Sequence, residues 1–217
     1  MTPFLWTTPI GVFVPLGLML LLGACTCATV EGDELDSVEG PLQTKEVTDA
    51  ANYKSVRQYY IANGAEVLHG RQVVVGPDGK VASEEYYRRG VRHGMHTIFY
   101  ADGRAAFQTS YSSGQEHGLR MTWNEVGFLV ELEAFQFGKQ DGPAFKWADT
   151  GQLAEECSFV DGALEGELTG WLSKAENRPW YRKEFHNGLQ HGFERWWDES
   201  GTLIEEKFFE NGLQISK

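Results

Sequence analysis

The sequence is poor in cysteine and in basic residues, and it contains none of the common short catalytic motifs. Its 217 residues include 3 cysteines, too few for a disulfide framework. The 19 Lys and Arg residues are outnumbered by 31 Asp and Glu, which gives a formal net charge of −12. Such a chain lacks the basic surface that nucleic-acid binding requires, and an anionic membrane surface would repel it. A cationic partner fits this charge better.

The missing motifs are G-x-S-x-G, the P-loop, paired C-x-x-C and H-E-x-x-H. Each of these places a nucleophile, a phosphate cradle or metal ligands at a fixed spacing. The sequence therefore predicts no catalytic residue, no cofactor and no metal site.

Charged side chains are also absent from the first 24 residues. Residues 9–24 read PIGVFVPLGLMLLLGA, which has the length of a signal-peptide core and is short for a membrane span. The run ends in Leu22-Gly23-Ala24-Cys25, which resembles the lipobox of bacterial lipoproteins. The resemblance implies cleavage after Ala24 and lipidation of Cys25, and two or three acyl chains give stable anchoring.

The same resemblance implies a place in the bacterial cell envelope. Because Thr26 rather than Asp follows the cysteine, the outer membrane is favoured in a Gram-negative host. The segment before the apolar run has no Lys or Arg. An uncleaved hydrophobic anchor, or a start codon at another position, therefore stays an alternative.

An acidic stretch follows the cysteine. Residues 27–53 contain seven acidic residues, one lysine and almost no large apolar side chain. Such a segment buries too little surface to offset the entropy of ordering the chain. We therefore predict a signal peptide at residues 1–24, a disordered tether at 25–53 and a folded domain at 54–217.

The folded domain is a glycine-spaced repeat. Its glycines form G-x-x-x-G segments whose first glycines recur at spacings of 24, 24, 24, 26 and 24 residues: Gly90, Gly114, Gly138, Gly162, Gly188 and Gly212. We call these the opener glycines, and the glycine four residues later the second glycine. A third glycine follows nine residues after the second in most units, at Gly103, Gly127, Gly151 and Gly201. A looser copy runs from Gly64 to Gly90.

The residues between glycines follow a strand pattern. The fifth residue after the second glycine is aromatic in five units: Phe99, Trp123, Trp147, Trp171 and Trp197. Another aromatic residue stands three before each next opener: Tyr87, Tyr111, Phe135, Phe159, Phe185 and Phe209. We expect the residues that begin the returning strand, such as Leu129 and Leu153, to share a face with this second series. Each unit is then a β-hairpin, and stacked units form an elongated, single-layer antiparallel sheet of about six 24-residue repeats.

The pattern resembles the MORN-repeat variant family, in its bacterial, antitoxin-labelled form. The resemblance covers roughly residues 59–217 and rests on N-G-x-x-x-G, an aromatic five later, x-G at the hairpin, L-x-x-E and F-x-x-G. Residues 188–212 match it best. The resemblance implies a non-enzymatic repeat module.

Two polar rows recur with the repeat. Residues just before the second glycine are His69, His93, His117, Asp141, Glu165 and His191. Equivalent positions lie one hairpin apart, about 9–10 Å, so they cannot close on one zinc ion. We interpret them as residues that cap turns. The second row, Glu131, Glu155 and Glu205, repeats because the unit repeats. Cys157 interrupts a charged position and is expected to be a half-buried thiol.

The fifth unit is the irregular one. It lacks the third glycine and carries SKAENRP at residues 173–179 instead. Aromatic and basic residues gather around this loop, and Trp and Arg are frequent at binding hot spots. One interpretation is that the tryptophans belong to the core and the charges are simply solvated. The other is a docking site, for which the candidate partner-binding residues are Lys174, Arg178, Trp180, Tyr181 and Arg182.

These observations support three functional hypotheses. The first is a lipid-anchored, extracytoplasmic scaffold that binds an unidentified protein without catalysis. The second is an antitoxin or immunity protein that occludes a cationic toxin, and the third is an envelope hydrolase. The membrane is contacted only through the N-terminal lipid, and the last strand offers an edge for self-association.

Overall fold

The computed structural model describes residues 40–173 and 176–216, and their regular structure is entirely β-strand. Contacts divide the chain into Met1–Val38 and Glu39–Lys217, and every described strand lies in the second part. The predicted signal peptide, Cys25 and the tether up to residue 39 lie outside the described residues. Within the described residues no helix is long and apolar enough to cross a bilayer.

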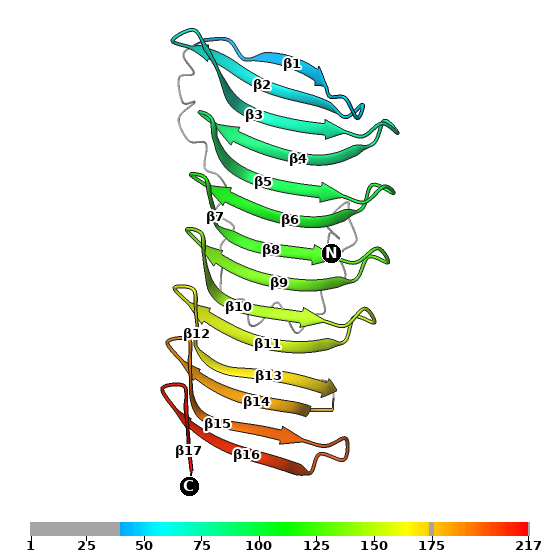
Figure 1. The fold of residues 1–217 in the computed structure, drawn as a ribbon. Helices are drawn as coiled ribbons and strands as arrows, with labels where there is room; N and C mark the ends of the chain where they lie inside the picture. Colours follow the sequence, from blue (N-terminus) through cyan, green and yellow to red (C-terminus); the bar gives the residue numbers. More distant parts are fainter. Residues whose placement is uncertain (1–39, 174–175, 217) are drawn as a thin grey trace, which may run out of the picture. The chain divides into compact units, whose positions relative to one another are not determined.

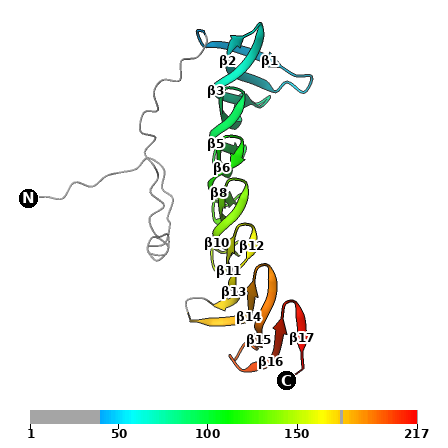
Figure 2. The same cartoon turned by 90° about the vertical axis from the view of Figure 1, so that its left-hand side faces the viewer.

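The strands form one open antiparallel sheet of hairpins that follow one another in chain order (Figures 1 and 2). They are β1 (Gln43–Thr48), β2 (Lys54–Ala62), β3 (Ala65–Val75), β4 (Val81–Arg88), β5 (Val91–Phe99), β6 (Ala105–Ser112), β7 (Gln115–Glu116), β8 (Gly118–Trp123), β9 (Leu129–Gln136), β10 (Lys139–Trp147), β11 (Leu153–Val160), β12 (Ala163–Leu164), β13 (Gly166–Ser173), β14 (Arg178–His186), β15 (Leu189–Trp197), β16 (Leu203–Glu210) and β17 (Leu213–Ile215). The predicted fold class, a single sheet of stacked hairpins, is confirmed.

Each opener glycine lies in a two-residue hairpin loop. In the loop between β4 and β5, Arg89 has φ 51° and Gly90 has φ 80°, and Arg88 pairs with Val91. Two consecutive positive φ angles are those of a type I′ turn, which matches the twist of the flanking strands. The opener's N–H then donates to a carbonyl of the preceding unit, as Gly114 does to Arg92 at 2.9 Å. The opener thus both turns the chain and links adjacent repeats.

The third glycine closes the opposite hairpin. In the loop between β5 and β6, the Gly103 N–H donates to the Tyr100 carbonyl at 2.9 Å, and the Tyr100 N–H donates to the Arg104 carbonyl at 2.8 Å. Gly103 has φ 89°. This is a three-residue loop with glycine in the left-handed conformation. The predicted glycine turn is confirmed.

A β-bulge follows each of these turns and corrects one expectation. Trp147 pairs with Leu153 and Lys146 pairs with Glu155, so Ala154 is an extra residue in β11. The extra residue reverses the alternation of side chains along the strand. Leu153 therefore shares a face with Trp147, whereas Phe159, opposite Gly142, lies on the other face. The expectation that Leu153 and Phe159 share a face was wrong.

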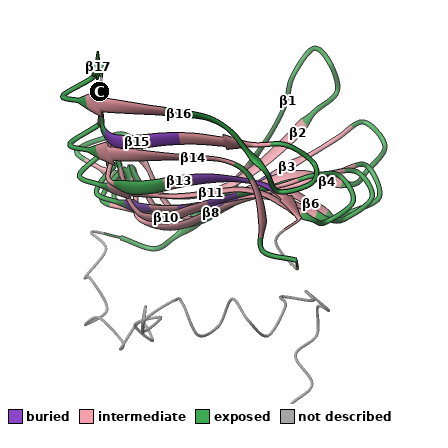
Figure 3. Cartoon of the chain, turned by 90° about the horizontal axis from the view of Figure 1, so that it is seen from below, coloured by how far each residue is buried: buried purple, intermediate pink, exposed green. Residues whose placement is uncertain are grey.

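The two aromatic series consequently lie on opposite faces of the sheet. We call the face that carries Tyr111, Phe135, Phe159, Phe185 and Phe209 face A. Face B carries Phe99, Trp123, Trp147, Trp171 and Trp197. Because the sheet is a single layer, most strand residues are half-buried and the turns are exposed (Figure 3). The most buried apolar residue is Leu132, at 4% exposure.

Part of the predicted tether is ordered. Residues 43–48 lie in the segment predicted to be disordered, but they form β1 and pair along β2, with Lys45 opposite Arg57. Lys45 also contacts Glu66 at 2.6 Å, and Tyr59 donates to Gln43 at 3.1 Å. Composition missed this strand because its stability comes from the edge of β2, not from its own apolar residues.

Candidate partner-binding site in the fifth repeat

Trp180 occupies the bulge position of the fifth repeat. Trp171 pairs with Pro179 and Gly170 pairs with Tyr181, so Trp180 is the extra residue. The equivalent residues in the other hairpins are Ala82, Ala106, Val130, Ala154 and Ile204. Trp180 is the one aromatic residue of this set, and it is 53% exposed. The bulge therefore presents an indole to solvent where most repeats have a small side chain.

Tyr181 lies on face A and is held from both sides. Its hydroxyl donates to the Glu155 carboxylate of the preceding repeat, and its ring lies 4.9 Å from that of Trp196. Gly170 leaves the space that the ring occupies, since a Cβ there would come within 2.3 Å of it. Burial, followed by the bond to Glu155, raises the pKa of Tyr181. These contacts make Tyr181 part of the sheet's packing.

Arg182 lies on the opposite face. Its guanidinium carbon is 5.9 Å from the ring centres of both Trp171 and Trp197, and its Nε is 3.5 Å from Glu167. A cation between two indoles on a half-exposed surface contributes about 0.5–1 kcal/mol per contact. Arg182 therefore joins the aromatic residues of adjacent repeats on face B.

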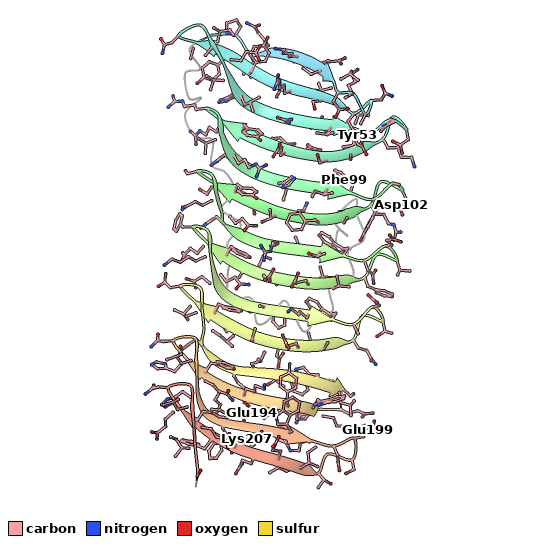
Figure 4. The ribbon with its side chains drawn as sticks, viewed as in Figure 1. Tyr53, Phe99, Asp102, Glu194, Glu199 and Lys207 are labelled. Carbon is pink, nitrogen blue, oxygen red and sulfur yellow. The ribbon has the colours of Figure 1, made fainter. Side chains whose placement is uncertain are left out.

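Arg178 lies at the irregular turn itself. Its Nη1 bonds Glu176 at 2.7 Å and its Nη2 donates to the carbonyl of Glu199 at 2.6 Å, in the next turn along that edge (Figure 4). Lys174 lies outside the described residues. The candidate residues thus lie partly at the turn edge and partly on the two faces. Because Tyr181 and Arg182 lie on opposite faces, a flat partner surface that covers Trp180 can contact only one of them.

Three residues of the row before the second glycine cap turns, as the sequence predicted. Glu165 accepts the backbone N–H of Asn187 at 2.8 Å and contacts His186 at 2.9 Å. The Nδ1 atoms of His69 and His191 accept the N–H groups of Arg89 and Asn211, at 3.3 and 3.5 Å. In each case the acceptor reaches the residue just before the next opener. The bond to Asn187 lowers the pKa of Glu165.

Face A also has a polar centre that the sequence analysis did not single out. Glu133 is 7% exposed, and it accepts bonds from Arg120 at 2.7 Å and Gln140 at 2.5 Å. Glu194 is 8% exposed, lies opposite Lys207 and accepts bonds from Gln190 and Trp196 (Figure 4). A sequence signal existed, since these residues lie at fixed distances from the glycines. Their burial depends on the strand register, which spacing alone does not give.

The recurrent glutamates Glu131 and Glu155 both pair with Lys146, one from each side. They are two strands apart, or about 9–10 Å. Cys157 is half-buried as expected, and burial raises its pKa to about 11. Among residues 40–173 and 176–216, no group of three His, Cys, Asp or Glu side chains is placed to hold a metal ion.

One segment of the chain matches a known protein family. Residues 190–211 match the MORN repeat variant. The matched segment runs from β15 to the end of β16 and contains one bulged hairpin. It supports the MORN-repeat family, a non-enzymatic type of repeat. The hairpins of β5–β6, β8–β9 and β10–β11 have the same register and bulge as this MORN repeat. No curated protein matches the chain.

Proposed function

We propose that this protein is a lipid-anchored, extracytoplasmic repeat scaffold that binds another protein and catalyses no reaction. MORN repeats are modules for protein or membrane interaction, which supports a binding role for the matched segment. The lipobox at Leu22–Cys25 supports the anchor. In a Gram-negative host, we propose the outer membrane as its location.

The observation that carries the binding role is the exposed indole of Trp180. A tryptophan side chain offers a large contact area with only two χ angles, so little conformational entropy is lost when a partner covers it. Arg178 and the rest of the irregular turn lie beside it in sequence. We therefore place the partner at the turn edge of the fifth repeat.

The partner can be obtained by crosslinking in native cells, then purified and titrated against the anchored protein. Trp180→Ala should weaken binding by 2 kcal/mol or more, roughly 30-fold, as expected for a hot-spot residue. Ile204→Ala is the matched control, because Ile204 occupies the same bulge position one repeat later and is 64% exposed. Equal losses in both variants would refute the assignment to the fifth repeat.

The anchor has its own test. An azido fatty acid supplied to cells should label the protein, and Cys25→Ala should abolish the label. Cys27→Ala is the control, since it lies two residues away and outside the lipobox. A Cys25→Ala protein that is still labelled rules out lipidation at this residue.

The net charge of −12 favours a second candidate, an antitoxin or immunity protein that neutralises a cationic toxin. In that case the partner should be basic and should arrest growth when it is expressed alone. Co-expression of this protein should restore growth. A neutral, harmless partner eliminates this candidate and leaves the scaffold role intact.

A further inference from the structure

The middle of face A carries a row of directly opposed pairs, one pair in each hairpin. In chain order they are Gln72–Glu85, His96–Thr109, Arg120–Glu133, Ala144–Cys157, Leu168–Lys183 and Glu194–Lys207. Five of the six pairs contain a long or ring-bearing polar side chain. The Ala144–Cys157 pair does not, so the row is interrupted in the fourth repeat.

In the third repeat an arginine fills this place. Arg120 bonds Glu133 at 2.7 Å, lies 3.4 Å from Glu116, and its guanidinium carbon is 4.3 Å from the centre of the Phe135 ring. One guanidinium is thus held by carboxylates at its edge and by an aromatic ring at its face. Such a site suits the flat, delocalised cation of arginine.

The fourth repeat keeps the aromatic ring of this site but has neither its cation nor its two carboxylates, because Gln140 and Cys157 stand 24 residues after Glu116 and Glu133. Twenty-four residues after Arg120 the chain has Ala144, whereas the equivalent of the Phe135 ring is retained as Phe159. A hollow of about 100 Å³ lies there, and its lining includes Ala144, Cys157 and Phe159. An engineered cavity of about 150 Å³ holds a benzene molecule, so this hollow has room for the head of one side chain and not for a larger metabolite.

The charges around the hollow favour a cation. Glu131 and Glu155 line it on either side of Lys146, whose side chain is 60% exposed and whose ammonium is 4.0 Å from Glu155. Glu131 makes no hydrogen bond or ion pair with any described residue. Cys157 stays protonated at neutral pH and adds no charge, because burial raises its pKa to about 11. The hollow therefore has an excess of negative charge and a carboxylate to accept new bonds.

We propose that this hollow binds the side chain of an arginine supplied by a partner protein. The guanidinium lies against the Phe159 ring, as that of Arg120 lies against Phe135, and donates to Glu131 and Glu155, which line the hollow. Arginine is preferred over lysine because a planar cation can stack on the ring and donate two bonds at once. That the arginine belongs to a partner protein rests on the proposed function, whereas the presence of a guanidinium site does not.

The probe is a pair of blocked tripeptides, acetyl-Gly-Arg-Gly-amide and its citrulline counterpart, which has nearly the same shape without the charge. Both are titrated into the full-length protein while the backbone amides of Ala144 and Cys157 are followed by NMR. The arginine peptide should shift these amides and bind about tenfold more tightly than the citrulline peptide, as expected for charge-assisted bonds. Equal binding of both peptides, or shifts confined to other repeats, overturns the proposal.

Three variants sharpen this test. Glu131→Gln should weaken the arginine peptide about tenfold, and Ala144→Arg should abolish its binding by filling the hollow from within. Glu205→Gln is the matched control, since it removes the same charge from the equivalent row three units later and should leave binding unchanged. Unchanged binding in Glu131→Gln overturns the proposal even if Ala144→Arg fails to fold.

The peptide titration does not involve the natural partner, so the two proposals fail separately. A partner that binds through Trp180 while the peptide does not bind refutes only the hollow. Peptide binding without any protein partner refutes the scaffold role and leaves an arginine site on face A.

Discussion

The Tyr181 hydroxyl donates a hydrogen bond to the carboxylate of Glu155, which belongs to the preceding repeat. This bond joins β14 to β11 across β13, so it links two strands that are not adjacent. The ring that carries the hydroxyl fills the space left by Gly170. The pair therefore contributes to cohesion between the fourth and fifth repeats.

Tyr181→Phe should lower the free energy of unfolding by about 1–2 kcal/mol, because the hydroxyl's bond to the charged Glu155 acceptor is lost while the ring is kept. Chemical denaturation of both proteins measures the difference. Tyr86→Phe is the control: its hydroxyl also bonds a carboxylate, that of Glu84, but on an exposed part of the sheet. Its loss should be about 0.5 kcal/mol or less. Equal losses would show that the link between repeats adds nothing.

The second glycine and the third glycine of a unit differ in how much space surrounds them. Gly142 has φ 111°, and a Cβ added there would lie 3.0 Å from the Cβ of Ala134. Gly103 has φ 89°, but a Cβ added there meets nothing within 4 Å. Alanine at Gly103 thus introduces backbone strain alone, whereas alanine at Gly142 adds a collision with the neighbouring strand.

We predict that Gly103→Ala costs about 1 kcal/mol of stability and that Gly142→Ala costs about 2–3 kcal/mol. Denaturant melts of the two variants test this order. A Gly142→Ala protein as stable as Gly103→Ala would mean that β9 moves freely away from β10, contrary to the close approach seen here.

The glycines and aromatic residues were sufficient to predict the sheet, because turn geometry and period-two alternation are local properties. The distribution of side chains between faces was not predictable in this way. One bulge residue per hairpin, such as Ala154, reverses the alternation of side chains between the two faces. A small residue at that position does not reveal the bulge in the sequence. The same limit applies to β1, whose order depends on pairing with β2.

The candidate site shows a similar division. Trp180 was singled out for its neighbourhood of aromatic and basic residues, and the bulge that exposes it became visible only in the register. The turn-capping role of Glu165 followed from its repeated position and is confirmed by its bond to Asn187. The hollow beside Ala144 was not predicted from the sequence. It is lined by residues from three strands and exists because Ala144 has a small side chain where the third repeat has Arg120.

His96 gives the sheet a pH dependence. It lies on face A with its Nδ1 buried and without a hydrogen bond, and its ring contacts Phe107 and Tyr111. Burial lowers its pKa from the usual 6.5, a shift that Glu85 opposes and Arg92 reinforces. The unfolded chain therefore binds a proton at a higher pH than the folded protein does. Stability is complete above about pH 6.5 and falls as the pH drops below that value.

His96→Asn should remove this part of the pH dependence. Few carboxylates change protonation in the pH range just below 6.5, because groups such as Glu84 and Glu194 have pKa values lowered from 4.5. Urea unfolding at pH 7.5, 6 and 5 should therefore show the wild type losing more stability than the variant. Parallel losses in the two proteins would contradict a buried, neutral His96.

Cys157 should be a slow nucleophile at alkaline pH, because it lies half-buried between Glu133 and Glu155 on the wall of the hollow. Burial, reinforced by Glu155, raises its pKa from 9.0 to about 11. Since only the thiolate reacts, alkylation at pH 9 should be about 50-fold slower in the folded protein than in urea. Peptide mapping of iodoacetamide-treated protein isolates the Cys157 rate from that of Cys27. Because the pKa of Cys157 is higher in the folded than in the unfolded protein, the stability that its thiol contributes below pH 9 is lost as the pH rises toward 11. Cys157→Ser should reduce this loss of stability. A Cys157 that reacts as quickly in the folded protein as in urea would show that the wall of the hollow is open to solvent, which would weaken the case for a fixed arginine site beside it.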